Sequence, residues 1–138
     1  MKTTIGIRNN NPGNIRKGEP WKGLACVQDD PDFCVFKSMH WGVRALVITL
    51  RTYVVVHKLH TIEQIIGRWA PTNENHTALY IQFVKSKFFV LPLLYPEDFY
   101  NRGSEQLYTL CKAICEYESK YFLPLWQFEE VCMKINNK

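Results

Sequence analysis

The residues with the clearest chemical character lie near the start of the chain, where residues 8–16 read Arg-Asn-Asn-Asn-Pro-Gly-Asn-Ile-Arg. Asn side chains bond to nearby backbone, Pro fixes one φ angle and Gly frees the next, so this stretch predicts a tight turn. Amide groups and two guanidinium groups held in a small volume suit a polar, hydroxyl-rich or anionic ligand. A capped N-terminal arm without a ligand explains the same residues equally well.

A second candidate for chemistry is Glu118, near the end of a helix predicted from Ser104 to about Tyr121. It lies four residues beyond Ile114 and seven beyond Cys111, which places it on the apolar stripe of that helix. Partial desolvation and the C-terminal end of the helix both favour the protonated carboxyl, which is the condition for a general acid near neutral pH. The alternative is a Glu at the edge of the stripe whose carboxylate reaches water or pairs with a Lys or Arg.

A third candidate is Glu74, at the corner between two predicted helices. The segment 68–77 reads Arg-Trp-Ala-Pro-Thr-Asn-Glu-Asn-His-Thr, and Glu74 falls in the first turn of the second helix. The helix dipole favours the ionised carboxylate at this position. Glu74 therefore suits a base, an electrostatic stabiliser or a simple helix cap better than a proton donor.

Helices must position most of these residues, because apolar side chains recur at helical spacing through much of the chain. Helices are predicted from about Met39 to His57 after a Ser38 cap, from Thr61 to a stop at Pro71, from an Asn73 cap through Val84, from Ser104 to about Tyr121, and from Pro124 to near Ile135. Thr61 and Gln64 have the spacing of a capping box. The first of these helices has apolar residues on several faces, which predicts that it is central and the most buried.

One part of the chain predicts strands instead. The segments 21–27 and 33–36 are rich in apolar residues and flank the turn Asp29-Asp30-Pro31-Asp32. This arrangement predicts a short β-hairpin near the N-terminus. The fold class expected is mainly α, formally α+β, in a single domain over residues 1–138.

Composition sets bounds on function without choosing one. The chain has 138 residues, 46% of them hydrophobic, which is enough to bury a core. A net charge of +4 permits attraction to polyanions such as nucleic acid or bacterial wall polymers. The 17 basic residues are scattered and form no block, so nucleic acid is not the expected partner.

Membrane, metal and cofactor functions are not expected from the sequence. The N-terminus has no apolar signal region, so synthesis in the cytoplasm without a signal peptide is predicted. The apolar run 43–56 is shorter than the ~20 residues of a membrane helix and reads as a core helix. The four His residues show no metal-binding pair, and the five Cys residues fit reduced thiols, although Cys26 and Cys34 could face each other across the hairpin.

Several of these segments together resemble a known group of proteins. They are the string 8–16, Trp21 with Gly23, Phe33 to Phe36, Gly42 with Arg44-Ala45, Ile65-Ile66 with Arg68-Trp69-Ala70-Pro71, and Glu74-Asn75 with Thr77 and Tyr80. In this combination they resemble small bacteriophage and prophage proteins of the "structural protein P5" kind. The resemblance covers about residues 5 to 85, and the Asn-Pro-Gly-Asn string is its most specific part.

The same region also resembles the lysozyme-like superfamily of cell wall-degrading enzymes. There, an Asn-rich turn, a β-hairpin and a central helix follow a catalytic helix that ends in Glu-Ser. Here too few residues precede the Asn turn to form that helix, but the segment 113–119, which ends in Glu118-Ser119, resembles it. We therefore predict a circularly permuted lysozyme-like domain in which Glu118 packs beside the Asn turn.

This resemblance implies a peptidoglycan-degrading glycosidase, of lysozyme or lytic transglycosylase type, that cleaves the β-1,4 glycan. Glu118 would be the general acid, with Glu74 as the candidate second carboxylate and Glu19 and Asp32 behind it. The substrate-binding residues implied are Arg8, Asn9, Asn10, Asn14, Trp69, Thr77 and Tyr80. The site of action would be the bacterial cell wall or the virion, and a non-catalytic virion structural or wall-binding protein on the same scaffold is the alternative, with phage virion proteins as partners.

Overall fold

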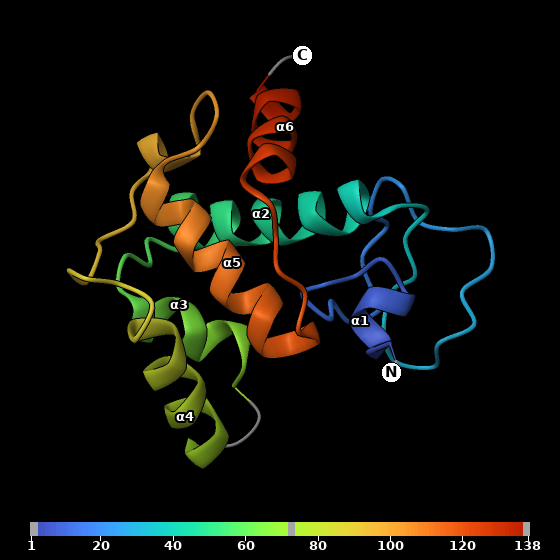
Figure 1. Cartoon of the computed structure of the whole chain (residues 1–138), viewed down its shortest axis with the longest axis horizontal. Helices are drawn as coiled ribbons and strands as arrows, with labels where there is room; N and C mark the ends of the chain where they lie inside the picture. Colours follow the sequence, from blue (N-terminus) through green and yellow to red (C-terminus); the bar gives the residue numbers. More distant parts are fainter. Residues whose placement is uncertain (1–2, 72–73, 137–138) are drawn as a thin grey trace.

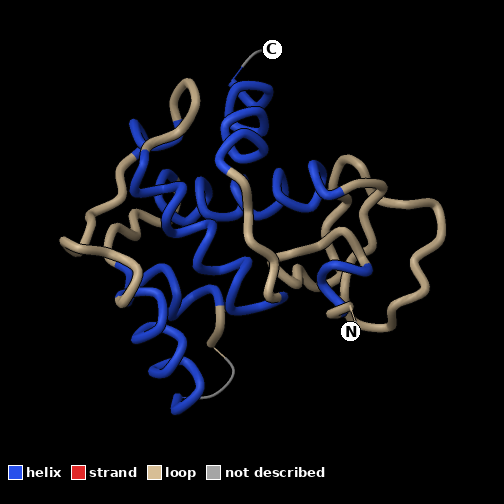
Figure 2. The backbone as a smooth tube through the Cα atoms, viewed as in Figure 1, coloured by secondary structure: helices blue, strands red, loops and turns tan. Residues whose placement is uncertain are grey.

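The structure is a computed structural model that describes residues 3–71 and 74–136, and the side chains of Glu74 and Asn75 also lie outside the described part. The described residues form six α-helices and one 3-10 helix (Figures 1 and 2). They are α1 (Ile5–Arg8), α2 (Met39–Val55), α3 (Ile62–Trp69), α4 (Glu74–Lys85), η1 (Pro96–Phe99), α5 (Glu105–Ser119) and α6 (Leu125–Asn136). The expectation of a mainly helical fold is confirmed.

Helix α2 runs through the middle of the molecule, as the sequence predicted (Figure 1). Its side chains at Val43, Leu46, Leu50 and Val54 are almost fully buried. It packs against α3, α6 and η1. Helix α3 in turn contacts α4, and α4 contacts α5, so a continuous core joins all the longer helices.

Local sequence signals set the helix boundaries well. The Thr61 hydroxyl accepts a hydrogen bond from the Gln64 backbone N–H, and the Gln64 side chain bonds back to the Thr61 backbone N–H, so the predicted capping box is formed. Ser38 stands at the N-cap of α2, but its side chain makes no capping hydrogen bond. The predicted Asn73 cap lies outside the described residues.

The predicted β-hairpin is not formed as a pair of strands. The loop between α1 and α2, residues 9–38, contains two isolated antiparallel bridges in the described structure, Arg16 with Phe33 and Leu24 with Phe36 (Figure 2). The Gln28 side chain explains the difference, because its amide nitrogen donates to the Ala25 and Val35 carbonyls and its oxygen accepts from the Val35 N–H. A side chain thus replaces ladder bonds that a second strand would make.

The two cysteines of that loop are not bonded to each other. All five cysteines, which lie within the described residues, are free thiols. Cys26 is exposed and Cys34 is buried, with its Sγ directed at the Arg16 carbonyl. Burial raises the pKa of the Cys34 thiol.

Segments far apart in the sequence meet at the C-terminal end of α5. The Thr4 hydroxyl donates to the Ser119 carbonyl at 2.7 Å, and the Ser119 hydroxyl donates to the Pro12 carbonyl at 2.8 Å. Gly6 fits here because a Cβ at this position would lie 1.7 Å from the Ser119 Oγ. Helix α1 and the start of the loop therefore dock directly onto the last turn of α5 (Figure 1).

Candidate functional site

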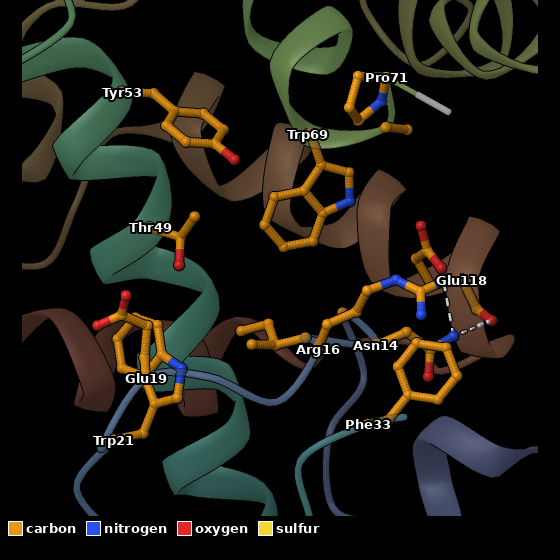
Figure 3. Close-up of a pocket in the computed structure, with 13 residues that line it drawn as sticks. Asn14, Arg16, Glu19, Trp21, Phe33, Thr49, Tyr53, Trp69, Pro71 and Glu118 are labelled. Carbon is orange, nitrogen blue, oxygen red and sulfur yellow. Dashed lines mark hydrogen bonds between the residues drawn. The ribbon is translucent and has the colours of Figure 1, made fainter. Parts of the chain in front are cut away.

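A cleft of about 530 Å³ lies where the 9–38 loop meets helices α2, α3 and α5 (Figure 3). The loop supplies Gly13, Asn14, Ile15, Arg16, Glu19, Trp21 and Phe33, α2 supplies Thr49 and Tyr53, the end of α3 supplies Trp69, Ala70 and Pro71, and α5 supplies Glu118. Four aromatic rings and two carboxyl groups thus surround one hollow, together with a guanidinium and hydroxyl groups. Such a lining suits a ligand with both apolar faces and many hydroxyl groups.

Glu118 and the Asn turn meet in this cleft, as the sequence analysis predicted. The Asn14 amide nitrogen donates to the Glu118 backbone carbonyl at 3.1 Å and to its carboxyl oxygen Oε1 at 3.2 Å (Figure 3). The two residues are 104 positions apart in the chain. Glu118 is half-buried as a residue, and its carboxyl is held by the protein at the edge of the cleft.

A second hollow of about 340 Å³ adjoins the first. It is lined by Ala70, His76, Thr77, Tyr80, Tyr117 and Glu118, so Ala70 and Glu118 belong to both hollows. The Tyr80 and Tyr117 rings stack with centroids 3.8 Å apart. Glu118 therefore borders both hollows.

Tyr80 is a buried residue whose phenol lies close to Glu118. Burial raises the pKa of its phenol well above the ordinary value, and the nearby Glu118 carboxyl raises it further. In the described part of the chain the Tyr80 hydroxyl has no hydrogen-bond partner of standard geometry, although the carboxyl of Glu118 and the indole of Trp69 lie close enough to influence it. The phenol stays protonated at neutral pH and offers a neutral donor.

Trp69 at the end of α3 lines the cleft, and Thr77 near the start of α4 lines the smaller hollow. A Cβ on Gly13 would lie 3.2 Å from the Trp69 ring, so the indole packs against the Asn turn. The Thr77 hydroxyl donates to the Ala70 carbonyl, which ties the start of α4 to the end of α3. Of the residues proposed to bind substrate, Asn14 and Trp69 line the larger hollow, and Thr77 and Tyr80 line the smaller one.

The structure does not bring Arg8, Asn9 and Asn10 to either hollow. Arg8 is exposed in α1. The Asn9 amide donates to the Asp30 carboxylate at 3.1 Å, and the Asn10 amide donates to the Phe36 carbonyl at 3.1 Å. The two amides hold the loop together, so neither faces a ligand in either hollow.

The three candidates for a second carboxylate differ in their position relative to the cleft. The Glu74 side chain lies outside the described residues, and Asp32 does not line the cleft. Glu19 does, and Figure 3 shows it on the far side of the cleft from Glu118. Of the three carboxylates considered beside Glu118, Glu19 is the one that the described structure places in the cleft.

Sequence reasoning missed two residues of α2 that line the cleft, Thr49 and Tyr53. They are four residues apart and therefore share a face of the helix. That spacing was visible in the sequence, but a Tyr and a Thr among apolar residues are equally typical of a helix packed in a core. The Arg68 guanidinium lies over the Tyr53 ring, 5.4 Å from its centroid, and burial raises the pKa of this phenol.

Within the described residues, no group of three His, Cys, Asp or Glu side chains is arranged to hold a metal ion. Among the same residues, no helix is long and apolar enough to cross a membrane. The 43–56 run lies mostly within α2, where it contributes to the core.

No protein-family model matches the chain. It is similar, however, to a phage protein. Protein P5 of Pseudoalteromonas phage PM2 is 48% identical over an alignment of 86 residues, and the match covers 59% of this chain and 54% of that protein. The chain spans about half the length of the curated relative it matches. This homologue supports a relationship to phage proteins of the P5 kind, and its name states no activity.

Proposed function

We propose that this chain is a peptidoglycan-degrading glycosidase, of lysozyme or lytic transglycosylase type, in which Glu118 is the general acid. The observation that carries the proposal is the position of the Glu118 carboxyl, half-buried between two adjoining hollows and held by Asn14 of the Asn turn. A glycosidase needs a carboxyl that reaches a glycosidic oxygen while the sugar rings extend on both sides of it.

The other groups of the cleft suit a glycan. The rings of Trp21, Phe33 and Trp69 offer apolar faces for sugar rings, and the hydroxyls of Tyr53 and Tyr80 offer neutral donors. The guanidinium of Arg16 lies over the Phe33 ring, 4.9 Å from its centroid, and adds a positive charge to the cleft. This charge suits the carboxylates that peptidoglycan carries.

In the proposed reaction, the proton of Glu118 moves to the bridging oxygen of the β-1,4 bond. The bond from that oxygen to the anomeric carbon breaks, and its electron pair stays on the leaving oxygen. The anomeric carbon is then attacked by water, with Glu19 as the candidate base across the cleft, or by a hydroxyl of the substrate itself. In the second case the attacking hydroxyl returns its proton to Glu118, and no second carboxylate is needed.

The test is clearing of purified peptidoglycan from mild acid to neutral pH. The wild type should clear it, and Glu118→Gln should lower the rate by at least about 100-fold, because an amide of the same shape cannot donate the proton. Glu116→Gln is the matched control, since Glu116 lies on the same helix and pairs with Lys87 at 3.2 Å outside the cleft. Equal clearing by Glu118→Gln and the wild type would remove Glu118 from the mechanism.

A non-catalytic virion structural or wall-binding protein on the same scaffold is the second candidate. The similarity to a phage protein over half its length favours this alternative, with other phage virion proteins as partners. It predicts that the wild type is retained on insoluble wall material without releasing sugars. Absence of clearing at every pH tested, together with such retention, would replace the enzyme proposal.

A further inference from the structure

The two hydrogen bonds from Asn14 to Glu118 fix the orientation of the Asn14 amide. One of its acceptors is the Glu118 backbone carbonyl, at 3.1 Å, which can only accept a hydrogen bond. The amide must therefore present its nitrogen, and the same nitrogen reaches Oε1 of the carboxyl at 3.2 Å. A rotation of the amide by half a turn would place two oxygens against each other.

This orientation leaves the rest of Asn14 in an unfavourable environment. The other atom of the amide, Oδ1 of Asn14, is buried without a hydrogen-bond partner among the described residues. The Asn14 backbone also has a φ angle of 50°, in the left-handed region that residues other than Gly and Asn rarely adopt. A buried acceptor left unpaired destabilises the folded state. Contacts that persist at such a cost are frequent at functional sites.

We infer that Asn14 is a positioning residue that holds Oε1 of Glu118 as an acceptor and leaves Oε2 to carry the transferable proton. The inference rests on the proposed function of Glu118. Because an oxygen that accepts an N–H bond is a poor place for a proton, the proton of the neutral carboxyl sits on the other oxygen. Asn14 thereby determines which oxygen of the acid meets the substrate, and it is assigned this role in place of direct substrate binding.

Other titratable groups also face the Glu118 carboxyl. Helix α4 contributes Tyr80 and His76, the 9–38 loop contributes Arg16 and Glu19 through the shared cleft, and α5 contributes Tyr117 and the buried thiol of Cys115. Asn14 does not titrate, and it is the described loop residue whose side chain donates a hydrogen bond to the carboxyl. Its removal should therefore have a specific effect on the ionisation of Glu118.

Asn14→Gly tests the inference with little effect on the backbone, because Gly adopts a φ of 50° freely. An N–H donor favours the ionised carboxylate, so its removal favours the protonated form. The alkaline limb of the pH–rate profile should move to higher pH, while the maximal rate falls at least about tenfold because the acid is no longer oriented. A variant that was only less well folded would lose rate without moving the limb.

Asn101→Gly is the matched control, because Asn101 has a φ of 53°, is exposed and lies outside both hollows. It should keep the wild-type profile. An Asn14→Gly enzyme whose alkaline limb coincides with that of the wild type would overturn the inference, even if its rate were lower.

A measurement without substrate separates this inference from the proposed function. In protein labelled with 13C at Glu carboxyls, the Glu118 resonance should titrate at higher pH in Asn14→Gly than in the wild type, with Glu118→Gln assigning the signal. This result is expected whether or not the wild type cleaves peptidoglycan. Identical titrations in the two proteins would show that Asn14 does not hold the carboxyl, while absence of clearing by the wild type would count against the proposed function alone.

Discussion

At the scale of single residues, the four Asn residues of the turn have different tasks. Asn11 is fully buried. Its amide nitrogen donates to the Ile15 and Cys34 carbonyls, and its amide oxygen accepts from the Ile15 N–H. Asn9 and Asn10 reach other parts of the loop. Asn14 alone among the four lines the cleft. Three of the four Asn side chains therefore stabilise the loop, and the fourth, Asn14, faces the candidate site.

Asp30 gives a pH-dependent test of the loop. Its carboxylate accepts backbone hydrogen bonds from Asp32 and Phe33, each at 2.9 Å, and a side-chain bond from Asn9, and these bonds lower the pKa of Asp30. A group whose pKa is lower in the folded state stabilises the protein above its unfolded pKa, and that contribution is lost as the pH falls through the folded value. Asp30→Asn should therefore show a shallower loss of stability than the wild type between about pH 5 and pH 2.

Urea unfolding at a series of pH values measures this difference. The carboxylate is at the surface, so the effect should be small but should have the stated sign. Parallel stability–pH curves for the two proteins would contradict the assigned role of Asp30. A loss of stability at all pH values, in addition to the shallower pH dependence, would not contradict this role, because the amide oxygen of Asn is a weaker hydrogen-bond acceptor than a carboxylate.

At the scale of elements, the first residues of helices α2 and α3 show how far the local sequence determines helix capping. Thr61 and Ser38 are both small hydroxyl residues at an N-cap with an extended backbone. Only the Thr61 side chain makes the capping bond, and it does so with a reciprocal bond from Gln64. The Gln three residues beyond Thr61 supplies the reciprocal bond, and Ser38 is followed at that position by Trp41, which cannot supply one.

The two caps provide a matched pair of substitutions. Thr61→Ala should lower the free energy of unfolding by about 1 kcal/mol, since the backbone N–H of Gln64 in the first turn of α3 loses its acceptor. Ser38→Ala should change it by less than about 0.5 kcal/mol, because no side-chain bond is lost. Chemical denaturation of both variants under one condition measures this, and equal losses would show that the capping bond is not the stabilising feature.

At the scale of the whole molecule, the cleft depends on how closely the Asn turn packs on α2 and α5. Gly42 of α2 allows this approach, because a Cβ there would lie 1.9 Å from the Asn10 carbonyl oxygen. On the other side, Gly6 gives the Ser119 side chain its space. Two glycines therefore hold the turn between two helices, and the position of Asn14 beside Glu118 follows from both contacts.

Gly42→Ala should destabilise the protein by about 3 kcal/mol, because the clash is with backbone that cannot rotate away. It should also reduce peptidoglycan clearing, since the turn would move from Glu118. Gly67→Ala is the matched control, because Gly67 lies in α3 and nothing lies within 4 Å of the added Cβ. That variant should be neutral or more stable by up to about 1 kcal/mol, owing to helix propensity. Thermal unfolding measures both, and a well-tolerated Gly42→Ala would contradict this packing.

The sequence by itself determined the five longer helices and the choice of residues worth examining, whereas the short helices α1 and η1 were not predicted. Helix periodicity, the Thr61 capping box and the stop at Pro71 act through neighbours in the chain, so they can be recognised without the fold. The hairpin could not be predicted correctly, because the Gln28 side chain competes for the backbone groups of both segments, and only the folded loop shows this.

Only the tertiary structure decided which of the candidate residues share a site. Glu118 and Asn14 are neighbours because α1 and the loop dock on the last turn of α5, a contact between residues 104 positions apart that no local pattern encodes. Asn9 and Asn10, of the same type and in the same turn, are directed into the loop by that packing. The sequence supplied the groups that can do chemistry, and the packing of distant segments selected those that face one cleft.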